Sequence, residues 1–261
     1  MSWHIAKASF IGGRREQQDR VTILSAASGV SHLVVVADGM GGHKQGALAA
    51  QKVVDTAESL FFNSPLSDPV DILRELCFNA HREIQNIDKR ERPFPGSTIV
   101  AAYLTKHHAW WAHIGDSRLY HIQNGEVRER TLDHSIAQLL VTRGEIDEGD
   151  LATSKFQNQL YMSLGGEQEP QPEFGYSKLD SGDILVLCTD GFWSDVTPAE
   201  ITDAVATDGL NDEVVEKLAE LATERGGQKG DNCTIAIAQY TKEPLLTLFM
   251  NLFKRLFQFF D

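Results

Sequence analysis

Residues 34–43 read VVVADGMGGH and carry the strongest local signal in the chain. A short apolar, β-branched run ends at the carboxylate of Asp38, and four glycines lie within the next eight residues. The run predicts a buried strand, and the glycines allow a sharp turn and a close approach of the backbone to an ion. An ordinary Asp-Gly turn is the simpler interpretation of the same residues, so the choice depends on the rest of the chain.

Composition limits the classes of partner. The chain has 261 residues, 42% of them hydrophobic, as expected for one large globular domain, alone or with a small appendage. Its formal net charge is -13. Nucleic acids and anionic membranes are bound through basic patches, so this charge argues against both as main partners. A surplus of carboxylates is compatible with bound cations.

Cysteine usage and the chain ends bear on location. The three cysteines, Cys77, Cys188 and Cys233, lie in apolar runs, which indicates reduced core thiols and a cytoplasmic protein. The N-terminal residues lack the basic and apolar segments of a signal peptide. No apolar run reaches the length of a membrane span.

Hydrophobic periodicity predicts a mixed chain. We expect helices over 46–62, 68–87, 133–140, 198–206 and 212–223. We expect strands over 3–11, 20–26, 32–37, 97–104, 108–114, 118–122, 174–178, 183–188 and 233–240. Asp68 and Pro69 suit a helix start, and Asn124-Gly125 suits a tight hairpin. Residues 144–165 show no clear period.

Aspartates recur where predicted strands end. Asp38, Asp116 and Asp190 each follow an apolar strand, while Asp19 and Asp231 each precede one. Carboxylates at strand ends can meet at one rim of a sheet, and Mg²⁺ and Mn²⁺ prefer such oxygen ligands. No histidines or cysteines stand at zinc-ligand spacing. The set therefore predicts a two-metal site, although each aspartate taken singly is explained as well by capping a turn.

An ordered series of short motifs strengthens that prediction. The series runs Arg14-x-x-x-x-Asp19, Asp38-Gly39-Met40-Gly41-Gly42-His43, Gly96-Ser97-Thr98, Gly115-Asp116-Ser117-Arg118, Asp133-His134-Ser135, Leu164-Gly165, Thr189-Asp190-Gly191 and Gly230-Asp231-Asn232. From about residue 8 to residue 240 it resembles the metal-dependent protein phosphatases of the 2C type, in their compact bacterial form. Each tripeptide is weak alone, but eight in the family's order and spacing are specific.

The resemblance implies a fold and a domain plan. The fold is α+β, a four-layer α/β/β/α sandwich with two central antiparallel sheets flanked by helices. The catalytic domain is expected over residues 1–242, with a flap at about 144–165 that borders the cleft. Many bacterial relatives carry His-Pro in this flap, where Ser154 and Lys155 stand here. That departure concerns substrate preference.

The resemblance also implies roles for individual residues. Its metal ligands would be Asp19, Asp38, the carbonyl of Gly39, Asp116, Asp190 and Asp231. They would hold two ions of Mn²⁺ or Mg²⁺, with a third beside Asp116 and Asp190 as in bacterial members. Arg14 would bind the substrate phosphate, because its planar fork matches phosphate oxygens. Asp38 and Arg14 would then be the catalytic residues.

The implied reaction is dephosphorylation of phosphoserine and phosphothreonine in proteins. In the implied reaction a hydroxide that bridges the two metals would attack the phosphate directly, without a phosphoenzyme. The metal ions would supply this hydroxide at neutral pH, because they lower the pKa of bound water from about 15.7 to about 7. Met40 stands where eukaryotic relatives carry a histidine, so the proton donor to the leaving group is a metal-bound water or His43. Two alternatives stay open: a catalytically weak phosphoprotein-binding module of the same fold, and a two-metal hydrolase of small phosphoesters.

Phosphatases of this kind oppose Ser/Thr kinases in bacteria. The expected partners are therefore a phosphorylated protein, namely a kinase or its target, with a forkhead-associated protein of a secretion system as one candidate. Arg118 is expected to pair with a carboxylate and not with substrate.

The resemblance does not cover residues 243–261. The apolar side chains there fall on one helical face: Leu245, Phe249, Leu252, Leu256 and Phe260. We expect an apolar amphipathic helix that packs on the domain, binds a partner or a second copy, or lies on a membrane surface. Its two basic residues are few for membrane binding, and it is too short to span a bilayer comfortably.

Overall fold

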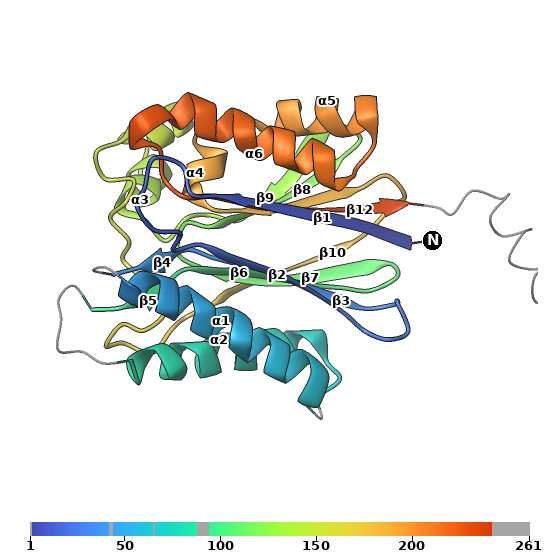
Figure 1. Cartoon of the computed structure of the whole chain (residues 1–261), viewed down its shortest axis with the longest axis horizontal. Coiled ribbons are helices and arrows are strands. Elements are labelled where there is room, and N and C mark those ends of the chain that lie inside the picture. Colours follow the sequence, from blue (N-terminus) through green and yellow to red (C-terminus); the bar gives the residue numbers. More distant parts are fainter. Residues whose placement is uncertain (1, 42–43, 65, 88–93, 242–261) are drawn as a thin grey trace, which may run out of the picture.

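Two sheets stacked face to face form the centre of the molecule, with helices on both outer sides (Figure 1). The computed structural model describes residues 2–41, 44–64, 66–87 and 94–241. Helices α1 (Lys44–Asn63) and α2 (Pro69–Gln85) cover one sheet, and α5 (Pro198–Asp208) and α6 (Asp212–Gly226) cover the other. The expected four-layer α+β sandwich with two antiparallel sheets is confirmed.

Each large sheet has five antiparallel strands. The first follows the order β1 (Ser2–Phe10), β12 (Cys233–Thr241), β11 (Ile184–Cys188), β8 (Arg118–Gln123) and β9 (Glu126–Arg130). The second follows the order β10 (Glu173–Lys178), β7 (His108–Ile114), β6 (Ile99–Leu104), β3 (His32–Ala37) and β2 (Arg20–Ser25). A two-stranded pair, β4 (Gly39–Met40) and β5 (Gly96–Ser97), lies beyond β3.

The apolar run before Asp38 is buried on both sides. Val34 and Val36 of β3 pack between the sheets, whereas Leu33 and Val35 pack under the helices. Successive side chains of a strand point to opposite faces, so a central strand covered on both faces needs apolar residues throughout. The expected buried strand is therefore present.

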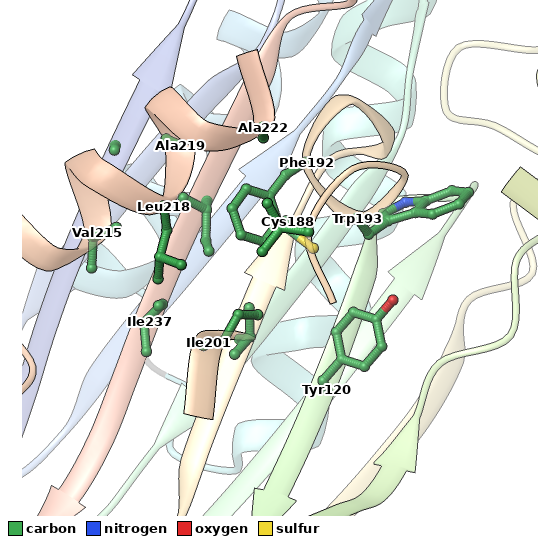
Figure 2. Close-up of a cluster of buried hydrophobic side chains, with 14 of the residues drawn as sticks. Tyr120, Cys188, Phe192, Trp193, Ile201, Val215, Leu218, Ala219, Ala222 and Ile237 are labelled. Atoms are coloured by element: carbon green, nitrogen blue, oxygen red, sulfur yellow. The ribbon is translucent and has the colours of Figure 1, made fainter. Parts of the chain in front are cut away.

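The other sheet is covered in the same way. Figure 2 shows Val215, Leu218 and Ala219 of α6 over Ile237 of β12, with Cys188 of β11 in the same cluster. All three cysteines are buried free thiols. Because both outer faces are filled by helices, the strands are fixed in register and so are the residues at their ends.

Local signals in the sequence act as expected at two places. The Oδ1 of Asp68 accepts a hydrogen bond from the amide of Val70 at 2.8 Å, and Pro69 opens α2. At the β8–β9 hairpin Asn124 and Gly125 have φ values of 54° and 83°. Both lie in the left-handed region that favours these residue types.

Other elements differ from expectation. The helix expected over 133–140 is α3 (Ile136–Thr142), because the Oγ of Ser135 caps it by accepting from the Gln138 amide at 3.1 Å. Strand β9 was not predicted as such, since its residues are largely exposed and show no apolar alternation. The one-turn helix α4 (Asp190–Trp193) was also missed.

Residues 144–165 contain a 3-10 helix, Glu148–Thr153, followed mainly by turns, and a second 3-10 helix covers Gly227–Lys229. Within the described part of the chain, no helix is long and apolar enough to cross a membrane. His43 and the tail at 243–261 lie outside the described residues.

Candidate metal centre

Four of the five strand-end aspartates line one cavity of about 190 Å³. The lining comprises Arg14, Gln18, Asp38, Gly39, Met40, Asp116, Asn158, Leu160, Asp190, Asp231 and Asn232. The fifth aspartate, Asp19, is buried, and its Oδ2 accepts a hydrogen bond from the hydroxyl of Thr189 at 2.9 Å. The structure thus brings together every side chain that the sequence analysis named as a ligand.

Asp38 is fixed through its backbone. Its amide donates to the Oγ1 of Thr98 at 2.9 Å, and its carbonyl accepts from the Oγ of Ser97 at 3.0 Å. A Cβ on the neighbouring Gly39 would meet the carbonyl oxygen of Gly46 at 2.0 Å. Only glycine allows this approach of the first turn of α1 to the strand end, which explains the Asp-Gly pair physically.

Asp116 and Asp190 are held by the turns that follow β7 and β11. Asp116 follows Gly115, whose φ is 103°, and the carbonyl of Asp116 accepts from the Nε1 of Trp193 at 2.9 Å. Asp190 is the first residue of α4. A Cβ on Gly191 would lie 2.2 Å from the carbonyl oxygen of Asn232, so this glycine lets the two loops touch.

Asn232 ties the N-terminal loop to the site. Its side-chain amide donates to the carbonyls of Ile11 and Glu16 at 2.8 and 3.0 Å. Its Oδ1 accepts from the amide of Gln18 at 2.8 Å. The sequence analysis quoted Asn232 as part of a motif but gave it no role. The structure identifies it as the residue that positions the loop carrying Arg14.

Arg14 lies at the mouth of the cavity. Its guanidinium forms an ion pair with Asp231, and its side chain is 53% exposed. A half-exposed guanidinium at the rim of a carboxylate cluster can reach an incoming anion. The position fits the phosphate-binding role that the sequence resemblance implies.

Burial dominates the electrostatics of the cluster. It raises the pKa of Asp19 to about 7 and that of Asp116 also to about 7, with further repulsion from Asp133. The pKa values of Asp38 and Asp190 are raised well above the ordinary value, first by burial and then by the neighbouring aspartates. Several carboxylates packed this closely favour protonation unless a cation compensates their charge.

The residues fit a cluster of divalent cations. Oδ1 of Asp19 and Oδ1 of Asp190 are buried and have no hydrogen-bond partner among the described residues. Buried oxygens without partners are costly, and a hard cation would satisfy them. The donor set is entirely oxygen, the set that Mg²⁺ and Mn²⁺ prefer.

The segment over 144–165 borders this cavity. Asn158 and Leu160 contribute to the lining. Its base is anchored to the start of α3 and to the loop before it. The amide of Ile136 donates to the carbonyl of Gln159 at 2.8 Å, and the amide of Tyr161 donates to the carbonyl of His134 at 3.0 Å. Its 3-10 helix, in contrast, is largely exposed.

Arg118 pairs with a carboxylate, as expected. Its Nε and one terminal nitrogen each donate to Asp133 at 2.8 Å, and its guanidinium stacks on the ring of Trp193 at 3.3 Å. Trp193 in turn holds the carbonyl of Asp116. The Arg118–Asp133 pair therefore supports the position of Asp116 in the candidate metal centre, through Trp193, and the sequence did not indicate this.

A histidine cluster also forms beside the site. Ligand-type atoms of His113, His134 and Glu173 lie within 4.8 Å of one another. The Nδ1 of His134 accepts from the Gly115 amide at 3.3 Å, which leaves the ring proton on Nε2, 3.4 Å from Glu173. In that tautomer the ring offers no lone pair to a metal, so we assign no zinc site here.

Comparisons with known proteins agree with this geometry. The family described as Protein phosphatase 2C matches residues 9–229 of the chain. Protein phosphatase PhpP of Streptococcus pneumoniae is 32% identical over 218 residues, which are 81% of this chain and 87% of that protein.

Solved structures are similar as well. The S. agalactiae serine/threonine phosphatase has a TM-score of 0.81 at 29% identity, covering 92% of this chain and 100% of that one. The catalytic domain of the phosphatase PstP in complex with 2 manganese ions has a TM-score of 0.77 at 27% identity, and the match covers 92% of this chain and 99% of that one.

Proposed function

The chain belongs to the protein phosphatase 2C family, and from that membership we propose that its aspartate-lined cavity is where phosphoserine and phosphothreonine side chains lose their phosphate. The chain is a protein serine/threonine phosphatase, and enzymes of this type depend on metal ions. The observation that carries the proposal is that Asp38, Asp116, Asp190 and Asp231, from distant parts of the chain, line one cavity, with the buried Asp19 next to them.

The aspartates divide into two groups in this proposal. Asp38 lines the cavity together with three of the other aspartates and would be shared by two ions, with the carbonyl of Gly39 beside it. Asp190 and Asp231 would complete the set of protein ligands around one of these ions, and Asp19 would lie in or next to the ligand shell. Asp116 would hold a third ion together with Asp190.

Two divalent cations, when bound, lower the pKa of water and neutralise the charge of a phosphate monoester. The chain's own residues then orient the substrate. Arg14 would bind phosphate oxygens in two parallel hydrogen bonds, exchanging its ion pair with Asp231 for the substrate. Asn232 would keep Arg14 in place by holding its loop.

The proton for the leaving oxygen would come from water. The side chains that line the described cavity include aspartates, an arginine and amides, but no histidine, lysine or tyrosine. His43, the other candidate donor, lies outside the described residues. The cavity lining contains no cysteine, so the chemistry of the cysteine phosphatases is not proposed for this site.

Hydrolysis assays test this function. With Mn²⁺ or Mg²⁺ the enzyme should hydrolyse p-nitrophenyl phosphate and phosphoserine or phosphothreonine peptides, and a chelator should stop both reactions. Asp38→Asn should be inactive, whereas the matched control Asp203→Asn, at an exposed position of α5, should be as active as wild type. No metal-dependent turnover would favour the phosphoprotein-binding module. A large excess of rate on small metabolites would favour the small-phosphoester hydrolase.

Finer points of the proposal concern ions, partner and location. We propose Mn²⁺ or Mg²⁺ as the ions, because the donors are all oxygen. A Ser/Thr kinase or its target is the proposed partner, and a forkhead-associated protein of a secretion system stays a prediction. A cytoplasmic location is supported by three buried free thiols in this chain, as in proteins of reducing compartments.

A further inference from the structure

An aromatic strip crosses the outer face of the second sheet. We define the aromatic strip as Phe61, Phe62, Tyr103, Trp110 and Tyr176. Phe61 contacts Phe62 and Tyr103 with ring centroids 5.1 and 6.0 Å apart. Tyr103 is the cross-strand partner of Trp110, whose ring lies 5.4 Å from that of Tyr176. The aromatic strip therefore runs from the end of α1 across β6 and β7 to the edge strand β10.

The helices leave the two ends of this strip in contact with solvent, while the three rings between them are half-buried. Phe62 is 55% exposed and Tyr176 is 51% exposed. Helix α2 packs on β6 and β7, and Arg74 of this helix reaches only as far as the ring of Phe174, at 5.6 Å. An aromatic strip that is open to solvent at both ends, in a chain with a net charge of -13, indicates a surface that another segment covers.

The described chain ends next to this strip. Strand β12 ends at Thr241, and the hydroxyl of Tyr240 is 2.9 Å from Nδ1 of His107 in the β6–β7 turn. The next residue, His108, stacks on Tyr176 with centroids 5.7 Å apart and shares a hydrogen bond with its hydroxyl at 2.8 Å. The last described residues of β12 therefore lie beside the β6–β7 turn, and this turn contacts Tyr176 at the exposed edge of the aromatic strip.

The sequence beyond this point suits that surface. Residues 245–260 predict a helix with one apolar face, which would be about 24 Å long at 1.5 Å per residue. The strands of the strip are about 4.8 Å apart, so such a helix is long enough to cross β10, β7 and β6 and reach the end of α1. The linker at 242–244 can extend about 10 Å, which equals the spacing of the two sheets. It is therefore long enough to reach the level of the second sheet beside the β6–β7 turn, and the start of the helix would pass around this edge to the outer face.

We propose that residues 245–260 dock on the aromatic strip of their own chain, with the apolar face toward Trp110 and Tyr176. The apolar face comprises Leu245, Phe249, Leu252, Leu256 and Phe260. A short tether gives the tail an effective concentration in the millimolar range, which favours its own chain over a second copy. The two basic residues, Lys254 and Arg255, are too few for strong binding to an anionic membrane. The proposal does not depend on the phosphatase activity.

Hydrogen–deuterium exchange of the full chain tests this docking. Amides within 249–257 should exchange at least 10-fold more slowly than in a free peptide of the same sequence, independently of protein concentration. Tyr176→Asp should remove this protection, whereas the matched control Val127→Asp, at an exposed position of β9 that is 43% exposed, should retain it. Retained phosphatase activity shows that either variant is folded. If Tyr176→Asp does not fold, Phe62→Asp replaces it.

Three results would overturn the proposal. The tail amides could exchange as fast as the free peptide, protection could rise with protein concentration as in a dimer with exchanged tails, or it could require vesicles of anionic lipid. Removal of residues 243–261 gives a second measurement. It should expose the aromatic strip and at least double the fluorescence of a hydrophobic dye, and Tyr176→Asp should lower that signal. An unchanged signal after truncation contradicts the docking.

Discussion

Removing one buried carboxylate should stabilise the metal-free protein, although it damages the metal centre. Burial and the charge of Asp133 raise the pKa of Asp116 from 3.8 to about 7. Below about pH 4 this group is protonated in both the folded and the unfolded chain and costs nothing. As the pH rises, the unfolded chain loses the proton first, so the free energy of unfolding falls until about pH 7 and is then constant.

The size of the effect follows from this shift. A rise of about 3 pKa units at about 1.36 kcal/mol each corresponds to about 4 kcal/mol above pH 7. At pH 5 less than half of this cost is present, because pH 5 lies only about 1.2 pH units above the ordinary pKa of the group. In a chelator Asp116→Asn should therefore be more stable than wild type by up to about 4 kcal/mol at pH 8 and by much less at pH 5.

Urea unfolding in the presence of a chelator, at pH 5 and pH 8, measures this difference. Asp203→Asn, an exposed carboxylate of α5, is the matched control and should change stability by less than about 0.5 kcal/mol. Excess Mn²⁺ should reverse the order, because it stabilises a folded state that binds it. If Asp116→Asn is no more stable than wild type at pH 8 and shows the same pH slope, the carboxylate does not carry the cost that we assign to it.

Further predictions concern catalysis and support of the site. Asp38→Asn and Asp190→Asn should each lower kcat/KM at least about 1000-fold with an unchanged circular dichroism spectrum, because both remove a shared ligand; near-normal rates would refute the site. Arg14→Ala should raise KM about 10-fold or more through loss of a charge-assisted hydrogen bond, and an unchanged KM contradicts its role. Arg118→Ala should destabilise the fold by about 3–5 kcal/mol because it leaves Asp133 buried and unpaired, as urea unfolding would show; a loss under 1 kcal/mol would contradict this.

Much of the site could be predicted because its chemistry is local in the sequence. Asp38, Asp116 and Asp190 each follow an apolar strand, and strand ends are readable from residue type and period. That they share one cavity follows from the pairing of β11 with β8 and of β6 with β3 and β7, and from the stacking of the two sheets, which no single segment encodes. The resemblance to a family supplied that information.

Other parts could not be predicted because they depend on contacts between distant segments. Nothing near Arg118 indicates that Trp193 covers its guanidinium, and nothing near Asn232 indicates that it clamps the loop ending at Gln18. Strand β9 pairs with β8 through backbone hydrogen bonds while its side chains face solvent, so it leaves no apolar pattern. Sequence periodicity reveals which side chains are buried. The contacts of Arg118 and Asn232 and the position of β9 depend instead on segments that are distant in the sequence.

Anomalous diffraction from crystals grown with Mn²⁺ tests the central claim most directly. The account predicts two strong peaks in the cavity, both in contact with Asp38, with Asp190 and Asp231 bound to one of them, and their loss in Asp38→Asn crystals. Peaks elsewhere on the surface, or no peak among these aspartates at saturating Mn²⁺, would contradict it.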